Sequence, residues 1–373
     1  MSLLSNVLGV RVLLWMGSPE PFPQPPDVIE ALTTVEVTLG DQGDGFQLTF
    51  TLTKDGLADF PLLQNPATDV FSRVAVAVVV GAVPQTLING VITHQQIEPH
   101  FQPGRTTLTL TGRDLGVLMD LEDRNDTFPN QADFMIANRI LARYATLGLI
   151  PQVTPTTDFP FELQRIPTQA ETDLQFLKRL AERNGYVFHI NPVLPNVSAA
   201  VFAPELRAAA PQPAFTVDSI TADNVVSLHF SNDGLAPLGI AGGSFIEPAS
   251  KDIFPVPSAT SLRQPPLAAS PTPTRRLERL RESANETPSR AFLSATAKIS
   301  GAPEPVTGRG EVDTTRYGSV LQARGVVGVR GVGPYDGLYY LRQVTHHIEI
   351  GKYTQSFVIT REGTGSLLPV VLA

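Results

Sequence analysis

The stretch "LQFLKRLAERNGYVFHI", residues 174–190, predicts a helix that ends at Asn184-Gly185 and passes directly into a strand. Just upstream, Thr168 and Glu171 have the spacing of a capping box. The apolar stripe of this helix is formed by Leu174, Leu177 and Ala181 and is widened by Phe176 and Leu180. Outside the stripe lie Gln175, Lys178, Arg179, Glu182 and Arg183. These charges are expected to face water on a scaffold helix, because a nucleic-acid-binding helix would need a stronger basic bias.

A second helix is predicted upstream, in "NQADFMIANRILARYATLG". Asn130 is its candidate N-cap, Asp133 falls in the first turn, and Gly148 is a candidate stop. Apolar residues recur at helical spacing at Phe134, Ala137, Leu141 and Tyr144, flanked by Ile136 and Ile140. The two helices and the strand that follows them predict a small α/β insert domain over residues 119–205.

Both ends of the chain have the pattern of β structure. In "FQLTFTLTK" apolar and polar residues alternate, as in a half-buried strand, with one face formed by Phe46, Leu48, Phe50 and Leu52. The first β region covers residues 1–118 and includes "VRVLLWMG" and "TTLTLTGRDL". The second covers residues 206–373 and includes "FLSATAKISG", "SVLQARGVVGVRG", "GLYYLRQVTHHIEI" and "TQSFVITRE". The predicted fold class is therefore mainly β with an α/β insert.

A proline-rich insertion at about residues 235–290 interrupts the second β region. "QPPLAASPTPT" and "RRLERLRES" predict loop and linker, with one short helix at residues 275–283. Residues 247–274 could also be a ligand for a partner domain, but a plain linker is the favoured interpretation.

The composition excludes several kinds of site. The 373 residues include no cysteine, which excludes disulfides, thiolate nucleophiles and Cys-based zinc or iron–sulfur sites and fits assembly in a reducing cytoplasm. The 33 prolines are nearly twice the usual frequency of about 5% and predict many loops and extended segments. The formal net charge is −8, so global attraction to nucleic acid or to anionic lipid is not expected.

The amino-terminal segment "MSLLSNVLGVRVLLWMG" lacks a basic leader and a small-residue cleavage site. Its apolar stretch contains Arg11 and is too short to cross a bilayer core of about 30 Å. Neither a signal peptide nor a transmembrane segment is predicted.

The histidines do not form a metal-binding pattern. His346 and His347 are adjacent in a predicted strand, so they point to opposite faces and cannot easily bind one metal ion. His94 and His100 are separated by a proline and have only Glu98 as a nearby carboxylate. No H-E-x-x-H motif occurs. The sequence therefore predicts no metal site.

Catalytic motifs are missing as well. Glu122-Asp123, beside Arg124 and Asp126, are interpreted as part of a solvated loop and not as a glycosidase pair. No G-x-S-x-G turn occurs, and the glycine-containing loops are not phosphate-binding fingerprints between strand and helix. The chain is expected not to be an enzyme and to have no catalytic or cofactor-binding residue and no cofactor.

Two segments of the β regions resemble each other. "GVITHQQIEPHFQPGRTTLTLTGR" covers residues 90–113, and "RQVTHHIEIGKYTQSFVITRE" covers residues 342–362. Each has an apolar-Thr-His strand, with His94 in the first and His346 in the second, then a Gly-containing turn and a returning strand. Chance matches are common in strand-rich chains, so duplication of one β unit and coincidence remain alternatives. Two such units in each chain would let a trimer present six near-equivalent units.

The segment "QAETDLQFLKRLAERNGYVFHI" resembles the one shared by the tail-hub proteins of contractile phages and phage-tail-like injection systems. These include the late control protein D family and the hub portion of type VI secretion spike proteins. "NGVITHQQIE…TLTLTGRDLGVLMD" is similar to the end of the family's first barrel, and "RYGSVLQARGVVGVRGVGPYDGLYYLRQVTHHIEI" lies in the stretch that is similar to the end of its second.

The resemblance implies two tube-like β-barrel domains with the α/β domain inserted between them, assembled as a pseudo-sixfold homotrimer. It implies a structural baseplate hub that joins a hexameric inner tube to a trimeric spike, alongside other baseplate proteins, in a particle assembled in the cytoplasm. Neither a membrane nor sequence-specific nucleic acid is an expected partner. Another structural tail protein, such as a distal tail or tube-terminator subunit, is an alternative, and a phage-borne cell-wall or polysaccharide hydrolase is a weaker one.

Overall fold

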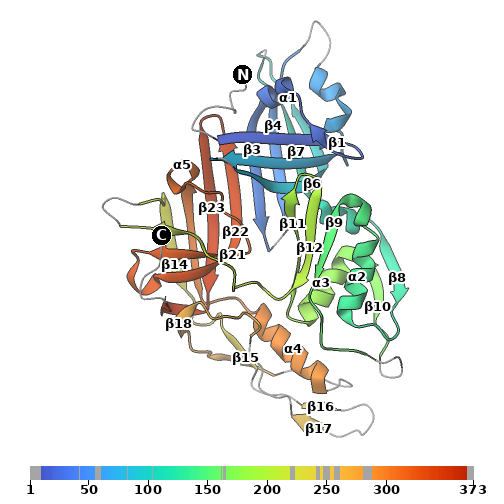
Figure 1. Cartoon of the computed structure of the whole chain (residues 1–373), viewed down its shortest axis with the longest axis vertical. Coiled ribbons are helices and arrows are strands. Elements are labelled where there is room, and N and C mark those ends of the chain that lie inside the picture. The colour runs from blue at the N-terminus through green and yellow to red at the C-terminus, as the bar shows by residue number, and fades with distance from the viewer. Residues whose placement is uncertain are drawn as a thin grey trace.

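The chain's largest feature is a 13-stranded sheet that runs through both β regions (Figure 1). The computed structural model describes residues 10–41, 43–54, 60–81, 83–102, 104–160, 162, 165–218, 223–240, 244–246, 253–255, 261–279 and 288–367. Strands dominate these ranges, and most of the long helices belong to the middle of the chain. The predicted mainly β class is confirmed.

The first β unit contains β1 (Val10–Gly17), β3 (Leu32–Gly40), β4 (Gly45–Leu52), β5 (Arg73–Val80), β6 (Val83–Glu98) and β7 (Thr106–Asp114). Its smaller elements are β2 (Phe22–Pro23), α1 (Pro26–Ala31), η1 (Pro61–Gln64) and η2 (Pro66–Thr68). The alternation predicted for β4 is confirmed, since Phe46, Leu48, Phe50 and Leu52 are all buried. They share one core with the apolar residues of β1, β3 and β5.

The second β unit contains β13 (Gln212–Thr216), β14 (Ser227–Asn232), β20 (Val306–Asp313), β21 (Gly325–Arg330), β22 (Gly337–Glu349) and β23 (Lys352–Arg361). Its short helices are α5 (Thr314–Tyr317) and η5 (Gly333–Tyr335). Phe215, Leu341 and Phe357 lie in its core, and the rings of Phe215 and Phe357 stack with centroids 4.1 Å apart.

Both β units have the same strand order. Hydrogen-bonded neighbours follow β1-β5-β6-β7-β4-β3 in the first unit and β13-β21-β22-β23-β20-β14 in the second. When the six strands of each unit are numbered in chain order, strands with the same number hold the same position in the sheet order of the two units. One pairing differs, because β1 runs antiparallel to β5 whereas β13 runs parallel to β21.

The two units also match in local backbone detail. Phe71 (φ 67°) donates its N–H to the carbonyl of Ile92 at 2.7 Å, and Arg324 (φ 63°) donates to that of Leu341 at 2.6 Å. Positive φ is uncommon outside glycine, so two such residues in one role form a specific match. Directly after the accepting residue the pairing register shifts in both units, in β6 before His94 and in β22 before Gln343.

These bulges align the two units residue by residue. His94 takes the place of Gln343, not that of His346. The sequence comparison that aligned the two histidines was therefore displaced by three residues, because apolar-Thr-His was matched without regard to the bulge.

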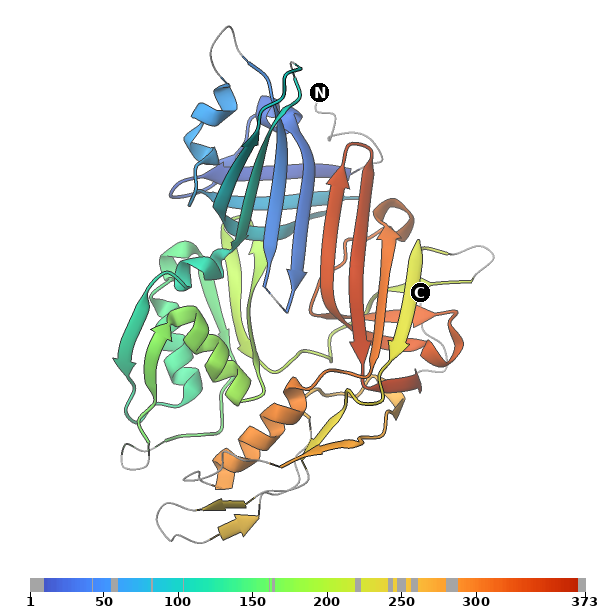
Figure 2. The ribbon, with the colours of Figure 1, turned by 180° about the vertical axis from the view of Figure 1, so that it is seen from behind.

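The two β units are joined strand to strand. After Leu341, β22 leaves β21, and from Gln343 to Glu349 it pairs with β3. Figure 2 shows the blue strands of the first unit beside the red strands of the second in one layer. The expectation of two barrels was wrong for the single chain, since the main described strands of both units belong to one continuous sheet and neither unit closes on itself.

The α/β insert begins at η3 (Leu115–Met119) and contains the helices α2 (Asp133–Ala142), η4 (Ala145–Leu147) and α3 (Asp173–Arg183). Its sheets are β11-β12-β9 and β10-β8, built from β8 (Asp123–Thr127), β9 (Leu149–Val153), β10 (Thr168–Thr172), β11 (Val187–Leu194) and β12 (Val197–Ala203). The predicted stripe of α3 is buried in a core shared with α2, β11 and β12.

The ends of α3 agree in part with prediction. Gly185 has φ 68°, so the predicted left-handed stop is confirmed. The capping box was wrong, because Thr168 and Glu171 lie in β10 and the cap is Thr172, whose hydroxyl accepts a hydrogen bond from the Gln175 N–H at 3.3 Å. Arg183 was wrongly assigned to the water-facing side, since it forms an ion pair with the buried Asp133.

One further expectation for the insert was wrong, and another holds in part. Asn130 is not the N-cap of α2, which begins at Asp133 after Ala132. The Asn130 side chain instead accepts a hydrogen bond from the backbone N–H of Glu162 at 2.9 Å. Glu122 lies in a bend with its side chain 72% exposed, as the solvated-loop interpretation expects, whereas Asp123 begins β8, which pairs along its length with β10.

The insertion of the second β unit has more regular structure than predicted. It contains β15 (Leu238–Ile240), β16 (Ser244–Ile246), β17 (Ile253–Pro255), β18 (Ala268–Pro271), β19 (Arg276–Glu278) and α4 (Pro288–Gly301), and β18 pairs with β24 (Gly363–Ser366). The helix expected at residues 275–283 was wrong, since Arg276–Glu278 is a strand and residues 280–283 lie outside the described ranges. The strand expected at residues 292–301 is the helix α4. Of the 247–274 segment, residues 247–252 and 256–260 also lie outside the described ranges.

No helix within the described ranges is long and apolar enough to cross a membrane.

Candidate functional site

One face of the large sheet is polar across both β units. Directly opposed residues on antiparallel strands point to the same side. One cross-strand row runs without a break through Asp313, Thr354, His347, Glu36, Gln47, Thr111 and His94. The next row runs through Lys352, Glu349, Thr34, Thr49, Thr109 and Gln96. The opposite face carries the core residues, so the joined units form one wall with a wet side and a packed side.

Among the described residues, each end of this wall is an open strand edge. β14 pairs with β20 on one side and with no other strand in that part of the chain. β6 pairs with β5 only up to Val91, and its last residues, up to Glu98, keep β7 as their one partner strand. An unpaired edge presents backbone donors and acceptors to another strand.

The paired histidines confirm the predicted strand geometry. His346 is fully buried and its Nδ1 lies 2.9 Å from the hydroxyl of Tyr353. Burial lowers the pKa of His346 to about 3, so this ring is neutral at physiological pH. His347 lies on the polar face, with its Nδ1 3.8 Å from Glu36 and its Nε2 2.9 Å from Glu349. Within the described ranges no group of histidines and carboxylates is arranged to hold a metal ion.

Arg324 ties the second β unit to the first. Its guanidinium donates to Asp44 at 2.7 Å and to the carbonyl of Gly40 at 2.8 Å, both in the β3–β4 turn. Asp44 in turn accepts from the Gly40 N–H at 2.9 Å. Burial lowers the pKa of Arg324, but the charge of Asp44, the hydrogen bond to it and the nearby charge of Asp41 together raise it by more, so the arginine stays charged. The pair therefore lies beside the β3–β22 junction and braces it.

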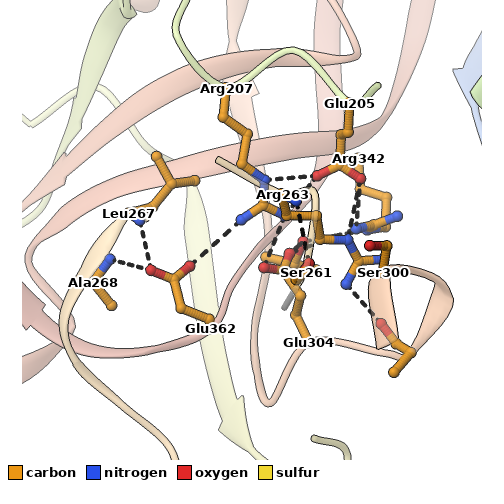
Figure 3. A network of polar contacts seen from close by, with 12 residues as sticks. Glu205, Arg207, Ser261, Arg263, Leu267, Ala268, Ser300, Glu304, Arg342 and Glu362 are labelled. Atoms are coloured by element: carbon orange, nitrogen blue, oxygen red, sulfur yellow. Dashed lines mark hydrogen bonds and ion pairs between the residues drawn. The ribbon is translucent and has the colours of Figure 1, made fainter. Parts of the chain in front are cut away.

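A second network of buried charges holds the insertion against the second β unit (Figure 3). Arg207, in the connection between β12 and β13, has a side chain only 1% exposed. It contacts Glu205 at 2.5 Å, Glu304 at 2.9 Å and Glu362 at 3.4 Å. Burial raises the pKa of Glu304, but the charges of Arg207, Arg263 and Arg342 and a hydrogen bond from Thr360 together lower it by more, so the net direction is downward.

Glu362 extends this network into the insertion. One of its carboxylate oxygens accepts from the backbone N–H groups of Leu267 at 2.6 Å and Ala268 at 2.7 Å (Figure 3). Arg263 donates to the carbonyl of Ala302 at 2.6 Å. These charges are neutralised within the molecule and hold four segments in place, so their arrangement is structural.

A cavity of about 680 Å³ lies where the α/β insert, both β units and α4 meet. Its wall includes Asp114, His189, Arg324 and Arg342. Sequence reasoning missed it, because these residues come from distant segments. Arg324 and Arg342 are already paired, with Asp44 and Asp41.

Replacing Asp114 with asparagine should stabilise the protein at neutral pH. Burial, then the charge of Asp44, raise the pKa of Asp114 to about 6. A carboxyl with a raised folded pKa gains stability as pH falls from about 6 towards its unfolded value of about 3.9. Asp114→Asn removes the charge and keeps the acceptor for the Gly116 N–H. We expect a gain of about 1–3 kcal/mol at pH 7.5 that vanishes near pH 4, measured by thermal unfolding across pH.

Asp313→Asn is the control for that prediction. Burial raises the pKa of Asp313, but hydrogen bonds from Thr315 and Arg316 lower it by more. Its neutralisation should therefore give no gain at pH 7.5. A loss of stability in Asp114→Asn at pH 7.5 would contradict the assignment.

No protein-family model matches the chain, and no curated protein matches it. Solved structures do match. The tail protein from Neisseria meningitidis MC58 superposes with a TM-score of 0.60 at 13% identity, covering 95% of this chain and 97% of that one. The 43 kDa tail protein of prophage MuSo2 from Shewanella oneidensis gives 0.61 at 13% identity, covering 95% and 100%.

A third match comes from a secretion system. The E. coli c3393 protein, a component of the type VI secretion system with structural similarity to the T4 bacteriophage tail proteins gp27 and gp5, gives a TM-score of 0.54 at 14% identity, covering 92% of this chain and 78% of that one. The chain thus has, over almost its whole length, the fold that these phage tail and type VI secretion proteins share.

Proposed function

We propose that the chain is a structural, non-enzymatic baseplate hub that works as a homotrimeric ring. One observation carries the proposal: two β units of equal strand order form a single wall with an open edge at each end. A contact between two different edges is heterologous, and such contacts close into a ring when the rotation allows it. Three copies would present six near-equivalent β units.

In this proposal the chain divides at residues 1–118, 119–205 and 206–373 into two tube-like units and the α/β insert between them. Each unit becomes part of a barrel only when neighbouring copies complete the wall. The polar face, with its rows of Thr, Gln, Glu and His, would line the channel, and the core face would point outward under the remaining strands. A lumen filled with water needs such a lining, since polar groups exposed to it stay solvated.

The proposed partners follow from this symmetry. One end of a pseudo-sixfold ring would bind the hexameric inner tube of a contractile tail or injection system, and the other end a trimeric spike, with other baseplate proteins around it. The particle would assemble in the cytoplasm. The likeness to a type VI secretion component that is itself similar to the T4 tail proteins gp27 and gp5 supports a place in a tail-like particle.

Sedimentation velocity on the purified chain, from low to high micromolar concentration, tests the ring. We expect a species of three times the chain mass of 40.2 kDa, and particles with threefold symmetry and a central hole in negative-stain images. A hexameric ring would favour the alternative of a distal tail or tube-terminator subunit. A chain that stays monomeric throughout would overturn the hub proposal.

A further inference from the structure

Inside the chain, the junction between the two units is a defined strand pair. The second half of β22 pairs antiparallel with β3, so that Gln343 lies opposite Gly40, Thr345 opposite Thr38 and His347 opposite Glu36. The hydroxyls of Thr38 and Thr345 are 3.2 Å apart, and the Nδ1 of His347 lies 3.8 Å from a carboxylate oxygen of Glu36. The β22–β3 pairing thus shows, within one chain, how a second β unit joins a first β unit.

The two open edges are the counterparts of these two strands. In the strand order, β6 holds the place of β22, and β14 holds the place of β3. The open half of β6 starts after its bulge, as the half of β22 that pairs with β3 starts after its own. The outer edge of β14 corresponds to the edge of β3 that β22 occupies.

The alignment fixes the residues. His94 and Gln343 both follow a bulge, so Gln96 corresponds to Thr345 and Glu98 to His347. Passing from strand to strand through the observed pairs, His229 corresponds to Glu36 and Ser231 to Thr38.

We propose that β6 of one copy pairs antiparallel with β14 of the next copy in the register of the β22–β3 junction; this rests on the proposed ring. Gln96 then lies opposite Ser231 of the neighbouring copy, and Glu98 opposite its His229. His94 lies opposite Asp233, which takes the place of Gly40.

The chemistry of the two edges is complementary in this register. Glu98 facing His229 repeats the His347–Glu36 pair with the two residue types exchanged. His94 facing Asp233 adds a second pair of opposite character. A register slipped by two residues would set Glu98 against Ser231 or Ser227 and lose the acid–histidine match. The charge pattern therefore favours one register.

The seam also covers apolar surface that the single chain leaves in water. On the core side Ile97, 42% exposed, would lie opposite Phe230, as His346 lies opposite Val37. Phe71, 55% exposed, has the place of Arg324, whose side chain reaches the β3–β4 turn. The segment after β14 corresponds to the β3–β4 turn, so Phe71 would contact that segment of the neighbouring copy, where Leu235 is 67% exposed. Burial of these side chains at the seam would add a hydrophobic contribution to the free energy of association, which hydrogen bonds between strand edges alone do not give.

Cysteine cross-linking tests the register directly, because the chain has no native cysteine. The variant Gln96→Cys/Ser231→Cys should give disulfide-linked dimers and trimers on non-reducing gels under mild oxidation. Neighbouring strands bring opposed Cα atoms to about 4.5–5.5 Å, within the range that a disulfide spans. Mixing the two single variants should give dimers and no larger species.

Two controls accompany this experiment. Thr38→Cys/Thr345→Cys should close a disulfide within one chain, since these positions are opposed in the β22–β3 junction. Gln96→Cys/His229→Cys is displaced by two residues and should cross-link at least several-fold less. Preferential cross-linking of the displaced pair would overturn the register, and a trimer in sedimentation without any linkage at position 96 would overturn the seam while leaving the ring. Monomers alone would overturn both.

A charge exchange gives a second readout without cysteines. Glu98→Lys should weaken trimer formation by roughly two- to fivefold in the dissociation constant of each seam, because it sets Lys opposite His229. Adding His229→Glu should restore assembly, whereas adding Ser227→Glu, two residues away, should restore it less. Equal recovery with both second changes would contradict the proposed register.

Discussion

Arg207→Ala should destabilise the protein by about 3–5 kcal/mol, the cost of breaking a buried ion network by removing one partner. The guanidinium is the one group that contacts Glu205, Glu304 and Glu362 together (Figure 3). Its removal takes the shortest ion contact from carboxylates whose side chains are 7%, 3% and 27% exposed. The contacts that remain, from Arg263 to Glu205 and from Arg342 to Glu205 and Glu304, are 3.5 Å long. The loss should appear as a lower midpoint of denaturant unfolding of the second β unit.

The pH dependence of that loss separates lost charge from lost packing. In the native protein the pKa of Glu304 is lowered, so its contribution to stability is present above the unfolded pKa of about 4.3 and lost as pH falls through the folded value. Without Arg207 the largest of the causes that lower the pKa of Glu304 is lost, so this pKa should rise and protonation should relieve part of the repulsion. The penalty of Arg207→Ala should therefore shrink in acid.

Arg276→Ala is the matched control. Arg276 is 46% exposed and 3.8 Å from Glu278, so an effect within about 0.5 kcal/mol is expected from a surface pair. If Arg207→Ala costs no more than this control, the network in Figure 3 does not hold the insertion in place.

The sequence predicted those parts of the fold that local periodicity decides. The stripe of α3 and the stop at Gly185 are visible because a 3.6-residue period and a left-handed glycine are local signals. The alternation in β4 is equally local. The segment at residues 292–301 was misread as a strand because its Ser, Thr and Ile have modest helix propensity. It is helical because α4 packs on α3 and β15, contacts that no window of sequence contains.

The candidate site was not predictable for a related reason. Arg207 and Glu362 are 155 residues apart, and Arg324 and Asp44 are 280 apart. Nothing in the sequence around either arginine distinguishes it from a solvated one. The bulges that align β6 with β22 are backbone features, so the sequence comparison could suggest a repeat and still misplace its register. The strand order, which shows the correspondence, depends on pairings across the whole chain.

The junction between the two β units should loosen when Arg324 is replaced. Its side chain is 9% exposed and that of Asp44 is 1% exposed, so Arg324→Met leaves a buried carboxylate without its partner. A loss of about 3–5 kcal/mol is expected. Hydrogen exchange should locate the loss, with faster exchange of the β3 and β22 amides that join the units and little change in α2, which lies in a separate core.

Two companion variants decide whether the ion pair is the cause. Arg324→Met/Asp44→Asn removes both charges and keeps an acceptor for the Gly40 N–H, so it should lose less than Arg324→Met alone. Arg324→Lys keeps the charge and loses the fork that reaches both Asp44 and the Gly40 carbonyl, so it should fall between them. If the double variant is the least stable of the three, packing and not charge pairing holds Arg324 in place. Phe71 occupies the position equivalent to Arg324 at the proposed seam. If Arg324→Met is the least stable of the three variants, as expected, an apolar residue cannot replace the arginine at the internal junction.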